Sequence, residues 1–412
     1  MNVIKKMKQT ELHEFAQILV NAYPGRGYTE DHINGTKKWF SDVVDQEPEQ
    51  QLFGAYRDGQ LVGGMILYTM KMNLISHSIQ TGGIGAVAVD LLHKKEKVSL
   101  DLFRYAFKSF LEEGIYFISL YPFDIGFYRK LGFGYGGQMK QYQVKPTHFP
   151  KGSSKEHIHF LQREKDHDEV LRCYTQFYGR TNGMIERHDV EDLFDANERR
   201  IIGYKKSGKV LGYLVFSYER KYDYVCNLVI QEIVYENAEV LLELCTYLHS
   251  QSDQFESIKV DTQDEYFHYL LSNPTRGTSD AFGSLYLETT TTGEGIMYRV
   301  TDITGIFQDL RDHNFGDQTC KCKLSVQDDL IESNNASVII HFTNGFAQIV
   351  ENEDYEVEIG MNVGEFSSLL MGAIDFKSLV RYGLATLSDC HYENTIQRIF
   401  RTDQKPMCFT SF

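Results

Sequence analysis

The chain has 412 residues, of which 42 are lysine or arginine and 57 are aspartate or glutamate, so its formal net charge at pH 7 is -15. At about 150 residues per domain, this length predicts two to three domains. The acidic excess argues against a nucleic-acid-binding protein, because such binding depends on neutralising phosphates with basic side chains. Hydrophobic residues (42%) and charged residues (24%) occur at ordinary globular frequencies, which excludes a mostly disordered chain.

No membrane or metal partner is expected. No run approaches the ~18 apolar residues of a membrane span, and residues 1–9 lack the apolar segment of a secretory signal, so we expect a cytoplasmic protein. The seven cysteines are odd in number and mostly lie among apolar residues, which predicts reduced core thiols. Cys320 and Cys322 form the one close pair, and no second pair or histidine spacing completes a tetrahedral metal site.

The first part of the chain predicts a mixed α/β domain over residues 1–150. Apolar residues at helical spacing predict two early helices, and alternating residues then predict strands with a hairpin turn at Asp58-Gly59. A further helix, a short apolar strand and a short helix that ends at Gly132 follow. The predicted elements are, in chain order, helices over 10–20 and 30–44, strands from 51 to 89, a helix over 97–113, a strand over 115–120 and a helix over 127–132.

A repeat defines the second domain. Residues 54–63 align without a gap with residues 203–212, and turn-forming residues at 146–154 separate the two copies. Each copy is a hairpin that leads into an apolar strand, further strands and one amphipathic helix. This pattern predicts two domains of one fold in tandem, the second over residues 151–293.

The third segment, residues 294–412, has a character of its own. Alternating residues predict strands over 337–347 and 355–360 around the Asn344-Gly345 turn, and helices follow. The chain ends on apolar residues that finish at Phe412, whereas most termini are polar and frayed. We therefore expect another part of the protein to hold this terminus.

One segment of the first domain carries the features of an anion site. The apolar strand at residues 86–89 leads into a loop rich in lysine and then into the start of a helix, where unpaired N–H groups attract negative charge. The sequence Phe-Tyr-Arg-Lys-Leu-Gly-Phe follows at residues 127–133. This pair of motifs resembles the acyl-CoA site of the GNAT acetyltransferase superfamily.

The resemblance implies a role for each part of that segment. Backbone groups on the strand would bind the pantetheine arm of acetyl-CoA, the loop and helix start would bind its pyrophosphate, and two residues of the neighbouring strand would flank the arm. Lys97 departs from the family pattern because glycine usually occupies this position, and Glu96 adds a repulsive charge. The implied residues are Val87, Ala88 and Val89 for the arm, Lys95, Glu96, Lys97, Val98, Ser99 and Leu100 for the pyrophosphate, and Phe123 with Asp124 beside the arm.

The whole chain resembles the enhanced intracellular survival protein family of bacterial N-acetyltransferases. This resemblance implies an α+β protein with a catalytic GNAT domain at 1–150, a degenerate GNAT-like domain at 151–293 and a sterol-carrier-protein-like domain at 294–412. The second copy has acidic residues where phosphate would lie, as at Glu236, and should not bind CoA. The family also implies a homo-oligomer, specifically a hexamer.

The same resemblance implies a mechanism. The α-carboxylate of Phe412 would accept the proton of the attacking amine, and Tyr128 would donate a proton to the CoA thiolate. Direct transfer is expected because the first domain contains no cysteine that could form an acyl-enzyme. Acetyl-CoA is the expected co-substrate, and the expected acceptor is a small cationic amine: an aminoglycoside, a polyamine or lysine. Tyr23, Trp39 and Phe40 lie in the helical region where such enzymes receive the acceptor.

Two alternatives stay open at this point. The first is a non-catalytic protein that binds acyl-CoA or an apolar ligand and has lost its pyrophosphate loop, which Glu96 and Lys97 favour. The second is a transferase that uses aminoacyl-tRNA, which also pairs two GNAT-like domains. The net charge of -15 disfavours this second alternative.

Overall fold

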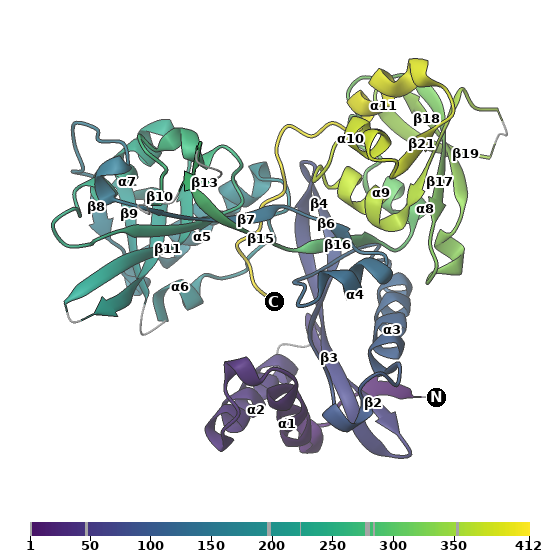
Figure 1. Cartoon of the computed structure of the whole chain (residues 1–412), viewed down its shortest axis with the longest axis horizontal. Helices are drawn as coiled ribbons and strands as arrows, with labels where there is room; N and C mark the ends of the chain where they lie inside the picture. Colours follow the sequence, from purple (N-terminus) through teal and green to yellow (C-terminus); the bar gives the residue numbers. More distant parts are fainter. Residues whose placement is uncertain are drawn as a thin grey trace.

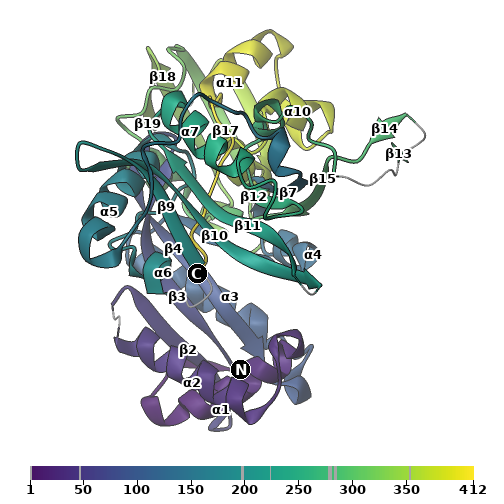
Figure 2. The same ribbon diagram turned by 90° about the vertical axis from the view of Figure 1, so that its left-hand side faces the viewer.

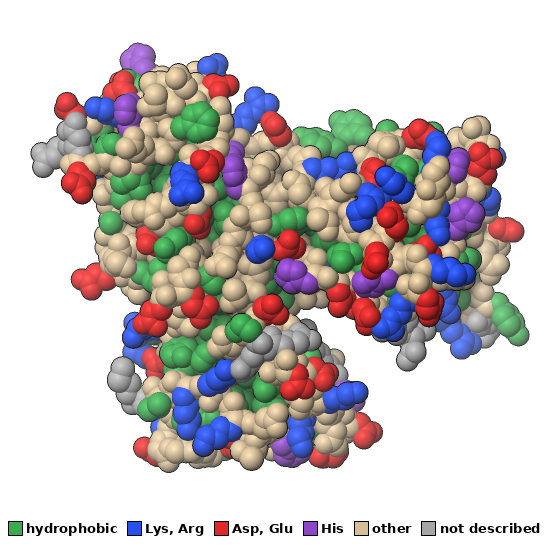
Figure 3. Space-filling model, turned by 180° about the vertical axis from the view of Figure 1, so that it is seen from behind, with side chains coloured by type: hydrophobic (Ala, Val, Ile, Leu, Met, Phe, Trp, Pro, Cys, Tyr) green, Lys and Arg blue, Asp and Glu red, His purple; other side chains and the backbone are tan. Residues whose placement is uncertain are grey.

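The computed structural model describes residues 2–45, 48–195, 199–222, 224–276, 281–282, 285–351 and 354–412. The chain forms three lobes, with early residues in one, middle residues in the second and late residues in the third (Figure 1). Seen from behind, the surface is hollowed between the lobe of the early residues and that of the middle residues (Figure 3). Across the described ranges, no helix combines the length and the apolar character that a membrane crossing requires.

The first domain is built on a seven-stranded sheet with the order β1-β2-β3-β4-β5-β16-β6. Its residues alternate between two faces, so Leu52 packs toward α1 and α2 whereas Phe53 packs toward α3. The strands are β1 (Val3–Lys6), β2 (Gln50–Arg57), β3 (Gln60–Leu74), β4 (His77–Val89), β5 (Phe117–Leu120), β6 (Gly134–Tyr135) and β16 (Met297–Val300), and the helices are α1 (Leu12–Ala22), α2 (Glu30–Asp45), α3 (Val98–Glu112) and α4 (Ile125–Lys130).

An opening in this sheet lies between β4 and β5. The two strands run parallel, and their register pairs Gly82 with Ile118 and Gly83 with Ser119 only. Further along β4, Ala86 and Val87 both lie opposite Met65 in a bulge, and Ala86 has a φ of 49°. The end of β4 therefore has backbone groups on its β5 side that no strand pairs.

The second domain repeats this architecture, as the sequence predicted. Its sheet has the order β15-β7-β12-β11-β10-β9-β8. Both hairpin turns use two residues of positive φ, namely Asp58 with Gly59 and Ser207 with Gly208. The strands are β7 (Gln138–Val144), β8 (Ile158–Phe160), β9 (Arg199–Lys206), β10 (Lys209–Tyr222), β11 (Val225–Tyr235), β12 (Ile258–Thr262) and β15 (Thr290–Glu294), with helices α5 (Arg163–Arg180), α6 (Glu191–Asp195) and α7 (Ala238–His249) and the small pair β13 (Ala281–Phe282) and β14 (Tyr286–Leu287).

The sheets do not follow the predicted boundaries at residues 150 and 293. Strand β7 precedes residue 150 yet lies in the second sheet, and β16 follows residue 293 yet lies in the first. The chain changes sheets at Gly136 and Gly137. A Cβ atom at Gly136 would lie 2.3 Å from the Ile296 carbonyl oxygen, and one at Gly137 would lie 2.3 Å from that of Pro406. Only glycine allows this close crossing.

The third domain is a five-stranded sheet of order β19-β18-β17-β20-β21 covered by helices. Asn344 and Gly345, both of positive φ, form the predicted turn. The strands are β17 (Cys320–Gln327), β18 (Ser337–Thr343), β19 (Phe346–Val350), β20 (Val357–Asn362) and β21 (Ala385–Leu387), and the helices are α8 (Ile303–Asp309), α9 (Val363–Leu370), α10 (Phe376–Arg381) and α11 (Glu393–Ile399).

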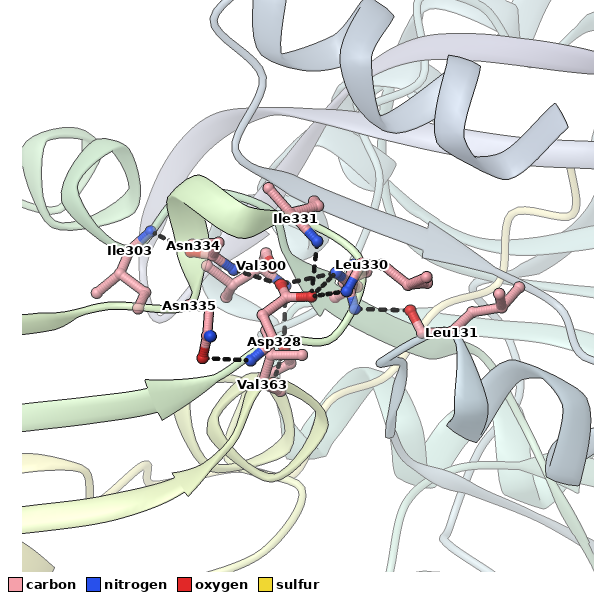
Figure 4. A network of polar contacts seen from close by, with 11 residues as sticks. Leu131, Val300, Ile303, Asp328, Leu330, Ile331, Asn334, Asn335 and Val363 are labelled. Carbon is pink, nitrogen blue, oxygen red and sulfur yellow. Dashed lines mark hydrogen bonds and ion pairs between the residues drawn. The ribbon is translucent and has the colours of Figure 1, made fainter. Parts of the chain in front are cut away.

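A buried ion pair joins the third domain to the first (Figure 4). Arg299 of β16 is 0% exposed and donates to both carboxylate oxygens of Asp328, at 2.8 and 2.7 Å, and to the Leu131 carbonyl oxygen at 2.6 Å. Asn334 also donates to Asp328, at 2.9 Å. Burial raises the pKa of Asp328, but the Arg299 charge and these hydrogen bonds outweigh burial and hold that pKa below its usual value. The end of α4 is thus fixed to the third domain.

Candidate active site

A cavity of about 1100 Å³ lies where the first domain, the second domain and the C-terminus meet. Its walls come from α1, α2, β3 and β4, from the β5–α4 connection and from residues 185, 186, 188 and 189 of the second domain. Of the predicted site residues it brings together Val87, Phe123, Tyr128 and Phe412. The loop at residues 95–100 lies outside this cavity, at the start of α3.

Phe412 lies against the glycine-rich part of β4. Its ring centroid is 5.6 Å from that of Tyr68 and 5.4 Å from that of Tyr121. A Cβ atom at Gly85 would lie 3.3 Å from the carboxyl carbon of Phe412, so this carboxylate sits directly on β4. The Tyr121 hydroxyl donates to the Thr410 carbonyl oxygen at 2.8 Å. The expectation that the apolar terminus is held by the rest of the protein is confirmed.

Tyr128 lies on α4 and is buried among aromatic rings. The side chains of Phe103, Phe123, Phe127 and Phe133 surround it. Burial, followed by the nearby Tyr23 and Asp124, raises the pKa of Tyr128 above the usual value of a phenol. The hydroxyl is protonated at physiological pH, as an ordinary phenol also is.

Asp124 and Phe123 have separate roles at the start of α4. The Asp124 carboxylate accepts a hydrogen bond from the Phe127 backbone N–H at 3.0 Å and so caps the helix that carries Tyr128. Phe123 is exposed, and its ring meets that of Tyr23 edge-on at 6.0 Å. The structure thus gives Asp124 a capping function that the sequence analysis did not assign.

The backbone at the end of β4 already has one side-chain partner. The Tyr23 hydroxyl donates to the Val87 carbonyl oxygen at 2.8 Å. The side chains of Ala88 and Val89 are buried in the cores on either side of the sheet, so only their backbone groups could contact a ligand. Tyr23 therefore lies across the predicted position of the pantetheine arm.

The loop before α3 contains two lysines in the left-handed backbone conformation. Lys95 and Lys97 both have a φ of 64°, and Lys97 forms the N-cap of α3. The next residues, Val98, Ser99 and Leu100, begin the helix, where N–H groups lack helical acceptors. Lys97 thus adopts a positive φ, a backbone conformation that glycine adopts more readily than lysine.

Arg57 offsets the charge of Glu96 and was missed by the sequence analysis. The Arg57 guanidinium forms an ion pair with Glu96, and His93 lies 3.0 Å from the same carboxylate oxygen. Hydrogen bonds from His93 and then Arg57 hold the pKa of Glu96 below its usual value. The turn signal placed Arg57 in a hairpin, but only the tertiary structure brings that hairpin beside the loop.

The cavity wall is acidic. Glu49, Glu186 and Asp189 line it together with the terminal carboxylate, whereas Lys71, which lies 3.5 Å from Glu186, is the one lysine or arginine among the described lining residues. The acidic stretch at residues 42–49, which ends at Glu49, was noted from the sequence, whereas Glu186 and Asp189 were not found because they belong to the second domain.

The three aromatic residues proposed near the acceptor separate in the structure. Tyr23 and Trp39 line the cavity. Phe40 does not, which corrects the prediction: its side chain is 0% exposed and stacks on Phe15 with a centroid distance of 4.8 Å. Neighbouring residues of α2 point to different faces, so Trp39 and Phe40 cannot both face the cavity.

Five of the seven cysteines are buried core thiols, whereas Cys226 is half-buried and Cys390 is exposed. All seven are free, and burial raises the pKa of Cys320 to about 12 and also raises that of Cys322. Among the residues that the structure describes, one group of three side chains, Asp389 with Cys390 and His391, has its ligand atoms close enough for a metal ion. This group is exposed and lies outside the cavity.

Comparison with protein families matches each domain. Residues 3–136 and residues 178–300 each match a model described as an acetyltransferase (GNAT) domain. Residues 309–409 match a sterol carrier protein domain. No curated protein gives a significant sequence match.

Several solved structures share the fold over the whole chain. A GCN5-related N-acetyltransferase from Anabaena variabilis superimposes with a TM-score of 0.79 at 17% identity, covering 100% of both chains. Eis1 from Mycobacterium abscessus gives 0.78 at 15% identity, also with full coverage of both chains. A probable N-acyltransferase from Enterococcus faecalis gives 0.77 at 15% identity over 100% of both chains. At these identities the likeness concerns the fold.

Proposed function

The chain is an N-acetyltransferase with two GNAT acetyltransferase domains and a sterol-carrier-protein-like domain, and we propose that it acetylates a primary amine of a small cationic acceptor. Acetyl-CoA is the acetyl donor, and the acceptor is an aminoglycoside, a polyamine or lysine. We also place the chain in the enhanced intracellular survival family. The full-length likeness to Eis1 supports this placement.

One observation carries the proposal: a single cavity holds Tyr128, the carboxylate of Phe412 and the unpaired end of β4. The unpaired backbone groups suit the amides of a pantetheine arm, which bind an extended strand through hydrogen bonds. The arm would replace the Tyr23 hydroxyl at Val87. The acyl group would then enter the cavity between the proposed acid and the proposed base.

The reaction then needs two proton transfers. The amine nitrogen attacks the thioester carbonyl carbon, and the C–S bond breaks as the amide forms. The Phe412 carboxylate accepts the proton that the nitrogen loses, and Tyr128 gives its proton to the departing sulfur. Tyr128 lines the cavity as a protonated phenol, which supports its role as the acid.

The charge of the cavity supports a cationic acceptor. Three acidic side chains and a terminal carboxylate face one lysine among the described lining residues. A cleft lined by one sign of charge concentrates ligands of the opposite sign. Amines with several positive charges should bind most tightly, because separate carboxylates can each bind one ammonium group.

The environment of Glu96 weakens the binding-protein alternative. That alternative depended on the repulsive charge of Glu96 and on Lys97 in place of the usual glycine. Arg57 and His93 offset the Glu96 charge, and Lys97 takes the conformation that glycine would take. We therefore propose that the loop at residues 95–100 still binds the pyrophosphate.

Thiol release from acetyl-CoA tests the proposal directly. Purified protein should release free thiol in the presence of spermine or an aminoglycoside, and Tyr128→Phe should lower kcat by about 10²-fold while acetyl-CoA affinity is retained. One alanine added after Phe412 should have a similar effect because it moves the carboxylate. An unchanged rate in the extended chain would disprove the role of the terminus.

The proposed hexamer is a separate question. Light scattering of the purified protein gives its mass, and a mass of one or two chains at micromolar concentration would contradict this part of the proposal. The acetylation chemistry does not depend on the outcome.

A further inference from the structure

The second domain has an opening that corresponds to the one described in the first. Strands β11 and β12 run parallel and pair only from Leu228 to Ile230 on β11. The repeat aligns Gly212 with Gly63, and their partners across the sheet are Tyr235 and Val89. Residues 231–235 thus occupy the place that the end of β4 occupies in the first domain.

C-terminal residues form part of the wall of this second opening. Its walls enclose about 480 Å³, and they include residues 231–233 and 235, residues 260–263 and the C-terminal residues 403–405, 407 and 409. The Arg180 guanidinium donates to the carbonyl oxygens of Tyr235 and Glu236. The last segment of the chain passes from the third domain between the other two (Figures 1 and 2).

Two backbone hydrogen bonds fix this segment within the second domain. The Met407 N–H donates to the Asn182 carbonyl oxygen at 2.8 Å, and the Cys408 N–H donates to the side-chain oxygen of Gln263 at 2.5 Å. Gln263 and Cys408 are each 2% exposed. The hydrogen bond between them is therefore shielded from water. Its loss would leave the buried Cys408 N–H without a partner.

An aromatic contact and a glycine complete the attachment. The ring of Phe409 stacks on that of Phe177 with a centroid distance of 5.7 Å and an angle of 17°. Gly183 has a φ of 90°, and a Cβ atom there would lie 2.9 Å from the Met407 carbonyl oxygen. At Gly183 the backbone of the second domain thus lies closer to the segment than a residue with a Cβ atom would allow.

The attachment lies only a few residues before the proposed base. Phe412 follows Cys408 by four residues, and Tyr121 of the first domain holds Thr410 in between. We propose that the opening of the second domain has become the docking site of the C-terminal segment, and that Gln263 is a positioning residue which sets where the Phe412 carboxylate lies. The catalytic part of this inference rests on the proposed function of Phe412, whereas the docking part does not.

Trimming by a carboxypeptidase tests the docking without any measure of activity. A carboxypeptidase removes an accessible C-terminal phenylalanine, and intact-mass spectrometry detects its loss. In the wild-type protein, removal should require opening of the docked segment. Gln263→Ala should speed removal of Phe412 at least tenfold. Gln263→Glu keeps the acceptor oxygen and should show slow removal, as in the wild type. The matched control is Gln254→Ala, at an exposed glutamine.

A second variant guards against general unfolding. Phe409→Ala changes only the segment and should also speed removal, with the thermal midpoint of the protein nearly unchanged. Both Gln263→Ala and Phe409→Ala should lower kcat by about tenfold to a hundredfold, because a small misplacement of a reacting group has effects of this size, and should leave acetyl-CoA affinity unaltered.

The outcomes separate the two parts of the inference. Removal of Phe412 at the wild-type rate in both variants would overturn the docking site. Faster removal with unchanged kcat would leave the docking site standing and would overturn the catalytic role of Phe412. Faster removal with lower kcat, reversed by Gln263→Glu, would support both parts.

Discussion

Gly83→Ala tests whether the position of Phe412 controls the rate. An added Cβ would lie 2.8 Å from two ring carbons of Phe412 and 2.6 Å from the end of Met70. Met70 can rotate away, but the Phe412 ring lies between those of Tyr68 and Tyr121. Since ordinary contacts begin at 3.4 Å, the ring must move by about 0.6 Å. A displacement of 1 Å can lower a rate by about 10²-fold, so we expect kcat to fall by about tenfold or more.

The assay is thiol release at saturating acetyl-CoA and amine. The KM for acetyl-CoA should stay within about twofold, because the substitution faces Phe412 and leaves the loop before α3 unchanged. Gly179→Ala is the control: no atom lies within 4 Å of its added Cβ, and alanine favours the α5 helix by about 1 kcal/mol. A Gly83→Ala protein with wild-type kcat and an unaltered thermal midpoint would refute the reasoning.

Three further predictions follow from single contacts. Arg57→Ala should raise the KM for acetyl-CoA by about fivefold, less at high salt, because it removes the permanent positive charge that offsets Glu96 beside the phosphates and leaves only His93 as its partner. Adding Glu96→Gln should restore the KM, and failure to do so would exclude this explanation. Calorimetric titration should give one acetyl-CoA per chain, since Arg180 occupies backbone carbonyls in the second opening; two sites per chain would contradict this. Asp328→Asn should lower the free energy of unfolding by about 3–5 kcal/mol at pH 7 because it leaves the Arg299 charge buried without a partner. The pKa of Asp328 is lowered in the folded state, so its contribution to stability is present above about pH 4 and is lost as the pH falls further. Denaturation curves should therefore show a smaller difference in unfolding free energy between wild type and Asp328→Asn at pH 3 than at pH 7. An equal difference at both pH values would argue against the ion pair.

Much of the fold was accessible from local sequence signals. The Asp58-Gly59 and Asn344-Gly345 turns, the helical spacing of α3 and the repeat of the hairpin each depend on residues close together in the chain. The exchange of β7 and β16 between sheets was not accessible, because it depends on pairing between strands far apart in sequence. Nothing in residues 297–300, Met-Tyr-Arg-Val, indicates which sheet they join.

The site divides in the same way. Contiguous motifs pointed to the positions of Tyr128 and of the loop before α3, and the apolar terminus drew attention to Phe412. The roles of Tyr128 and Phe412 came only from the family resemblance. Arg57, Glu186 and Gln263 were missed because each acts on a partner brought to it by tertiary packing. A lone arginine at a hairpin turn or a lone glutamine after a strand has no sequence signal for such a role.

The three domains depend on one another for the site. The first sheet requires β16, whose Arg299 charge is neutralised by Asp328 of the third domain. The third domain also supplies the segment that the second domain holds, and this segment ends on the first domain at Gly85. A chain cut before the third domain would therefore lose the proposed base and leave a buried arginine without a partner. The sterol-carrier-protein-like domain therefore has a structural role even without a ligand of its own. Its Asp328 neutralises Arg299, which binds the end of the helix that carries Tyr128, and its last segment carries the Phe412 carboxylate into the cavity.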